Sequence, residues 1–143
     1  MKHRIGVIAL ALVALCAAAI AQTAPNNDSW VGIWQGDTFG LPTGTMTLAT
    51  DTGTLGGTLV LDIIQREDGQ PRVIAQEPHV LVRPQVDGRK LSFDVRMQKR
   101  DGSVRVASFV VTRESDSKVS LHCVNCGPDA PVVEMAKNEN SAR

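Results

Sequence analysis

Two-residue alternation of apolar and polar side chains is the feature that most constrains this chain. The alternation is clearest over residues 91–98, where the apolar positions are Leu91, Phe93, Val95 and Met97. Successive side chains of a strand point to opposite faces, so this pattern is typical of a half-buried strand. The same odd-numbered spacing recurs in Leu55, Leu59, Leu61 and Ile63, and shorter versions appear in Met46 with Leu48 and in Val119 with Leu121 and Cys123. The alternation predicts an all-β chain.

Turn signals separate these segments. Asp-Gly occurs at residues 68–69, 87–88 and 101–102, each time between apolar runs, and this dipeptide tolerates the backbone of tight hairpin turns. Pro71, Pro78 and Pro84 crowd the middle of the chain. Because proline cannot donate to a ladder, that stretch is expected at a sheet edge or at bulges. We therefore predict an antiparallel up-and-down meander of about eight strands, either closed into a barrel or, as the alternative fold, an open β-sandwich.

The phase of the alternation changes within residues 103–113. Val104 and Val106 occupy even positions, whereas Phe109 and Val111 occupy odd ones. A β-bulge near Ala107 would bring both pairs to one face. A strand that is buried on both faces would also explain the change.

The first 21 residues have the pattern of a secretory signal peptide. A basic start is followed by an apolar run over residues 5–20 and by small residues at 19 and 21. The run is shorter than the roughly 20 residues of a membrane-spanning helix. We expect a signal peptide at 1–21, a flexible lead-in at 22–29, one domain at 30–137 and a disordered tail at 138–143. The protein is then secreted or periplasmic, with no integral membrane span after cleavage.

The first strand of the predicted domain opens with Trp30-Val31-Gly32-Ile33-Trp34. Its Gly-x-Trp motif resembles the start of the first strand in the lipocalin, fatty-acid-binding and avidin group of barrels. The opening is also similar to that of small uncharacterised secreted bacterial proteins with a Trp-x-Gly-x-Trp motif. The resemblance implies a lipocalin-like barrel that Trp34 seals at one end.

The barrel interior is the first candidate site. An eight-stranded barrel is wide enough to be filled by side chains or to hold one small ligand. A secreted barrel that binds a small apolar ligand is the first functional hypothesis, and a non-enzymatic interaction or structural module of the cell envelope with a dry core is the alternative. The residues expected to line the ligand site are Trp34, Met46, Leu61, Ile63, Phe93, Val95 and Met97.

Cys123 and Cys126 form a Cys-x-x-Cys pair at a predicted strand end. Pro128 and Pro131 follow, which disfavours the helix on which thiol-redox motifs depend. A local disulfide in an oxidising compartment is the favoured interpretation. Free thiols, and a thiol-redox or metal-binding role, remain the alternatives.

Composition and missing motifs exclude several function classes. Fifteen basic residues balance 15 acidic ones, and only 3% of residues are aromatic, so neither a basic face nor a supply of rings for stacking favours a nucleic-acid partner. The sequence has no nucleophile elbow, zinc-protease helix or phosphate loop. We expect a non-enzymatic protein without cofactor or metal, and the sequence names no protein partner.

Overall fold

The computed structural model describes residues 26–38 and 41–139. It holds a short 3-10 helix, η1, at Asn27–Trp30 and nine strands. The strands are β1 (Gly32–Thr38), β2 (Leu41–Asp51), β3 (Thr54–Glu67), β4 (Gln70–Val80), β5 (Val82–Asp87), β6 (Lys90–Gln98), β7 (Val104–Arg113), β8 (Lys118–Cys123) and β9 (Val133–Lys137). The predicted all-β class is confirmed, with one strand more than expected.

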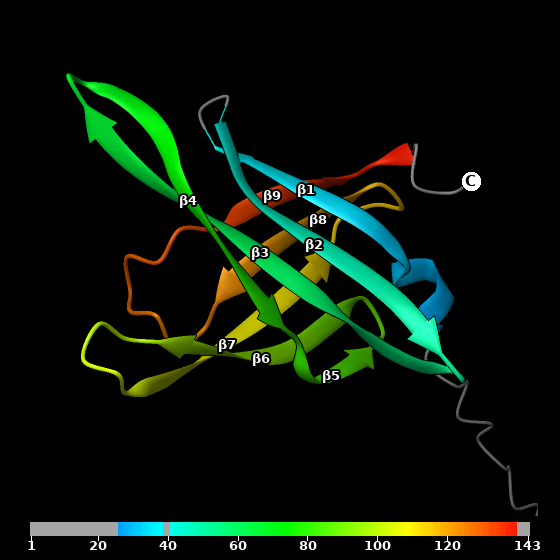
Figure 1. The fold of residues 1–143 in the computed structure, drawn as a ribbon. Helices are drawn as coiled ribbons and strands as arrows, with labels where there is room; N and C mark the ends of the chain where they lie inside the picture. Colours follow the sequence, from blue (N-terminus) through cyan, green and yellow to red (C-terminus); the bar gives the residue numbers. More distant parts are fainter. Residues whose placement is uncertain (1–25, 39–40, 140–143) are drawn as a thin grey trace, which may run out of the picture.

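All nine strands belong to one antiparallel sheet in the order β4-β3-β2-β1-β9-β8-β7-β6-β5. Each pair consists of strands that follow one another in the chain, except that β1 pairs with β9. The two edge strands, β4 and β5, are separated by Leu81 alone and form no ladder with each other in the described chain. In Figure 1 the part of the sheet with β1–β4 crosses over the part with β6–β8. The meander is therefore curled but not closed, consistent with a barrel or an open sandwich.

The two edges meet at the corner around Leu81. The Leu81 N–H donates to the carbonyl of Gly57 at 3.0 Å, and Nδ1 of His79 donates to the carbonyl oxygen of Arg96 on β6 at 3.1 Å. The chain thus passes from the side of β3 to the side of β6 through a single residue.

The core lies between the facing parts of the sheet and consists of apolar side chains from most strands. No buried polar or charged residue occurs within the described ranges. Burial of apolar surface is the main favourable term in folding, so this contiguous cluster holds the curled sheet together. Its largest fully buried members are Trp30, Trp34, Met46, Leu48, Leu59, Leu91 and Met135.

The hairpin turns and the edge strands lie where the Asp-Gly pairs and the prolines of the sequence predicted them. All three Asp-Gly pairs fall at hairpin turns, where Gly69, Gly88 and Gly102 have positive φ angles. The proline-rich stretch forms the two edge strands, and the register shifts at a bulge in both β3–β4 and β5–β6.

Neither explanation of the phase change in residues 103–113 holds, because β7 has no bulge near Ala107 and its outer valines Val104 and Val106 are exposed. β7 pairs with β6 in unbroken register from Val104 to Thr112. Ala107, Phe109 and Val111 point into the core, whereas Val104 and Val106 lie on the outer face. The change of phase in the sequence therefore reflects two solvent-facing valines and not an extra residue.

The predicted signal peptide at 1–21 lies outside the described residues, as do residues 140–143 of the predicted tail. Within the described ranges, no helix has the length and apolar character needed to cross a bilayer.

Candidate functional site

The residues predicted to line a ligand site occupy three environments. Trp34, Met46, Phe93 and Val95 belong to the buried core, and Leu61 and Met97 pack against it from partly exposed positions. Ile63 is 36% exposed and lies outside this cluster. Trp34, Met46 and Val95 have no solvent-accessible surface. The structure therefore brings most of the predicted set together as mutually packed side chains.

The two tryptophans of the opening motif are both fully buried members of the core. The indole N–H of Trp34 donates to the carbonyl of Trp30 at 2.9 Å. The Arg113 guanidinium lies 4.4 Å from the centre of the Trp30 ring, and the Lys137 ammonium lies 5.2 Å from that of Trp34. A cation over an aromatic face is attracted by the ring quadrupole, so each tryptophan is covered from outside by a basic residue.

Arg113 is held rigidly in this position. Its Nη2 donates to the carbonyl of Ser29 at 2.6 Å, which ties β7 to the segment before β1. Burial lowers the pKa of Arg113 from its usual value, and no hydrogen-bond acceptor meets its Nε among the described residues. Arg113 thus has a structural role, because its guanidinium covers the Trp30 ring and hydrogen-bonds to a backbone oxygen.

Cys123 and Cys126 form a disulfide across the turn after β8, with Cα atoms 5.5 Å apart. The predicted local pairing of these two cysteines is confirmed. Asn125 within the loop accepts the Ser108 N–H at 2.9 Å and donates to the Val106 carbonyl at 3.1 Å. The described residues contain no group of three or more His, Cys, Asp or Glu side chains that could bind a metal ion. The disulfide-bridged loop thus holds the Asn125 side chain against β7, where its amide hydrogen-bonds to the backbone of the strand.

The outer face of β6 and β7 carries two parallel rows of side chains. The outward residues of β6 are polar, and three of the five outward residues of β7 are valines. Register pairs each member of one row with a member of the other, as Ser92 with Val110, Asp94 with Ser108, Arg96 with Val106 and Gln98 with Val104. Val104 is 62% exposed and Val106 is 46% exposed. This face offers both charge and apolar surface to solvent.

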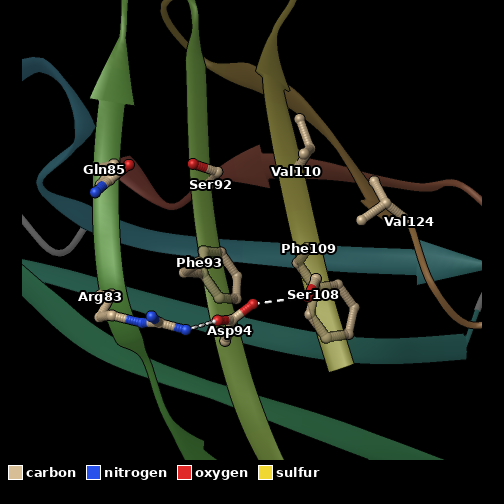
Figure 2. Close-up of a pocket in the computed structure, with 9 residues that line it drawn as sticks. All are labelled: Arg83, Gln85, Ser92, Phe93, Asp94, Ser108, Phe109, Val110 and Val124. Atoms are coloured by element: carbon tan, nitrogen blue, oxygen red, sulfur yellow. Dashed lines mark hydrogen bonds and ion pairs between the residues drawn. The ribbon is translucent and has the colours of Figure 1, made fainter. Parts of the chain in front are cut away.

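Arg83, Asp94 and Ser108 form the centre of this face (Figure 2). Nη2 of Arg83 lies 2.7 Å from one Asp94 oxygen, and the Ser108 hydroxyl donates to the other oxygen at 2.7 Å. These hydrogen bonds, that of Ser108 foremost, lower the pKa of Asp94. Arg83 has a φ of 51°, in the left-handed region, at the bulge of β5. A non-glycine residue there costs of order 1–3 kcal/mol, and the bulge turns Arg83 toward β6.

Three adjoining depressions follow the two rows, and together we call them the outer groove. The first, of about 270 Å³, contains the centre and is bounded by Val110 and Val124, as Figure 2 shows. The second, of about 370 Å³, shares Arg83 and Asp94 with the first. The third, of about 660 Å³, shares Arg96 and Val106 with the second and continues to Val104. The groove is therefore lined along its length by arginine and valine side chains.

Arg96 differs from Asp94, which lies two residues before it on β6. Asp94 is satisfied from two sides, whereas within the described chain the Arg96 guanidinium has neither a hydrogen-bond nor an ion-pair partner. A guanidinium presents five N–H donors in a fork that matches a carboxylate. Arg96 is thus a cation available to a bound anion in the groove.

The outer groove was not identified from the sequence, because the bulge at Arg83 and the outward direction of Val104 and Val106 depend on register with β6. The available signal was the polar residues that alternate in 92–98, together with Val104, Val106 and Val110 after the Asp101-Gly102 turn.

Comparisons with known proteins add no relative to this description. No family model, no curated protein and no solved structure matches the chain.

Proposed function

We propose that this protein is a non-enzymatic interaction module of the cell envelope, in which the outer groove holds an extended, acidic segment of a partner protein. The observation that carries the proposal is the free Arg96 guanidinium beside exposed valines, on a face held by a solvent-excluded core. An extended peptide lying along the groove would place carboxylates toward the β6 row and apolar side chains toward the β7 row.

The packing of the interior supports this choice over the first functional hypothesis. Trp34, Met46 and Val95 have no accessible surface, and interiors packed to native density hold few voids larger than a water molecule. Six of the seven positions expected to line a ligand belong to this packed core or lie against it, and the seventh, Ile63, is exposed. Binding of a small apolar ligand stays a prediction, and titration with a fluorescent fatty acid tests it.

Defined peptides test the groove directly. The probes are fluorescein-labelled hexapeptides in which valine alternates with glutamate, with lysine or with glutamine, and the readout is fluorescence anisotropy. We expect the glutamate peptide to bind in preference to the other two, with an affinity that falls with added salt because exposed charges are screened. Equal binding of the glutamate and lysine peptides would overturn the proposal.

Two variants separate the groove from general charge effects. Arg96→Glu replaces attraction by repulsion, and we expect it to weaken glutamate-peptide binding by about tenfold or more. Arg100→Glu makes the same change of charge in the exposed turn after β6, outside the groove, and should leave the affinity nearly unchanged. Equal losses in both variants would show attraction to the whole surface and not to the groove.

A saturable, one-to-one fatty-acid titration in the absence of peptide binding would favour the interior-ligand hypothesis over this proposal. Neither mode requires a reacting group, because binding a peptide or an apolar ligand breaks no covalent bond.

A further inference from the structure

β4 is an edge strand with an apolar, solvent-facing surface. It pairs with β3 on one side and stands at the end of the sheet on the other. In Figure 1 its hairpin with β3 reaches beyond the rest of the sheet. Val73 is 37% exposed and Ile74 is 57% exposed. Such an edge is a template for another strand.

The sequence of this edge is complementary to itself when read in the opposite direction. Residues 71–78 are Pro-Arg-Val-Ile-Ala-Gln-Glu-Pro. An antiparallel partner with the same sequence, centred between Ile74 and Ala75, places Arg72 opposite Glu77 of the second copy, and Glu77 opposite its Arg72. Each proline then lies opposite a proline. We propose that two copies of this chain associate through their β4 edges in this register.

The backbone permits the pairing because of the bulge at Ile74. The Leu81 N–H donates to the Gly57 carbonyl, so β4 residues opposite odd-numbered residues of β3 form the hydrogen-bonded pairs of this ladder. The backbone N–H and C=O groups of β4 residues opposite even-numbered residues of β3 therefore point to the free edge. Val73 and Gln76 both oppose even-numbered residues. Val73 and Gln76 are three residues apart, yet the N–H and C=O groups of both point to the free edge, because the bulge inserts one extra residue between them. Val73 of one copy can therefore exchange hydrogen bonds with Gln76 of the other.

The same register limits the assembly to two chains. Pro71 and Pro78 also oppose even-numbered residues of β3, and neither has an N–H to extend the new ladder. A two-fold interface uses the same patch on both copies and is then closed. The association is thus a discrete dimer over about six residues of each edge, smaller than the roughly 800 Å² per partner of a standard interface.

The charged groups near this edge leave the pairing available. Arg72 Nη1 is 3.2 Å from Glu67 on the same hairpin, with both side chains largely exposed, and such pairs contribute little to stability. Nε2 of His79 lies 3.7 Å from a carboxylate oxygen of Glu77. Arg72 and Glu77 oppose Gln65 and Leu61, so they lie on one face of the hairpin and meet the partner's charges on that face.

Charge exchange tests the register, with sedimentation equilibrium as the readout over about 1–500 µM, a range that reaches weak interfaces of this size. We expect the unaltered protein to dimerise and Arg72→Glu and Glu77→Arg each to weaken the dimer about tenfold or more, because each brings like charges together twice. An equimolar mixture of the two variants should recover the dimer as a heterodimer. The double variant should recover a homodimer.

Arg100→Glu, which changes the charge away from the edge, is the control and should leave dimerisation unchanged. Circular dichroism of every variant confirms that the fold is retained. A protein that stays monomeric at every concentration in this range would overturn the proposal. It would indicate that Pro71 and Pro78 prevent pairing at the β4 edge. A dimer that the single variants leave intact, or that their mixture does not recover, would equally overturn it.

Discussion

The hairpins β3–β4 and β6–β7 are built from similar sequence patterns but differ in burial. β6–β7 runs in unbroken register, and its inward side chains Leu91, Val95 and Val111 are fully buried. β3–β4 carries a bulge, and most of β4 is exposed on both faces. The difference arises because β6–β7 faces another part of the sheet along most of its length, whereas the end of β3–β4 reaches past it (Figure 1).

One face of β3 shows where the core ends. Leu59, Leu61 and Ile63 follow the same alternation, yet they are fully buried, partly buried and 36% exposed in that order. The pattern identifies the face to which a side chain points. Burial also requires a second layer opposite it, and the alternation does not record where that layer stops.

The largest expected effect is a difference between two truncations on this face. Leu59→Ala should lower the free energy of unfolding by about 2–5 kcal/mol, because it removes a fully buried side chain and leaves a cavity. Ile63→Ala, four residues along the same strand, should cost less than about 1 kcal/mol. Urea unfolding of both variants checks the difference, and similar losses would contradict the view that the core ends before Ile63.

A pair of adjacent glycines near the base of the same hairpin gives the next effect. A Cβ on Gly57 would collide with the carbonyl oxygen of Thr47, whereas a Cβ on Gly56 would meet nothing within 4 Å. Gly57→Ala should therefore destabilise by about 1–3 kcal/mol, as overpacking does. Gly56→Ala should be neutral or stabilise by up to about 1 kcal/mol, since alanine restricts the unfolded chain. Thermal unfolding of the two variants gives the comparison, and equal melting temperatures would show that β2 and β3 are not in close contact there.

The smallest effect concerns acid stability at the centre of the outer groove. The pKa of Asp94 is lowered by Ser108 and Arg83, so its ionised form stabilises the fold above the unfolded-state pKa of about 4. This contribution is lost as the pH falls through the lowered pKa of the folded state. Asp94→Asn should be less stable than the unaltered protein at pH 7, and the gap should narrow toward pH 3. A constant gap across that range in urea unfolding would contradict the assigned cause.

Local patterns in the sequence account for the strands, the turns and the edges. Alternation located β6, Asp-Gly pairs marked three hairpins, and prolines indicated the edge strands β4 and β5. The alternation hinted at the residues of the outer groove but not at their arrangement, which depends on which outward residues of β6 face Val104 and Val106 across the ladder. The corner at Leu81, where His79 meets β6, likewise joins segments whose contact no local pattern specifies.

The pairing of β1 with β9 has a consequence for the order of folding. Every other ladder joins strands that are adjacent in the chain, so hairpins can form early with little loop-closure entropy. The β1–β9 ladder must instead bring together segments about 100 residues apart, and Trp34 lies within it. The sheet can therefore be completed only after the last strand is available, and we expect this closure to be the slow step of folding.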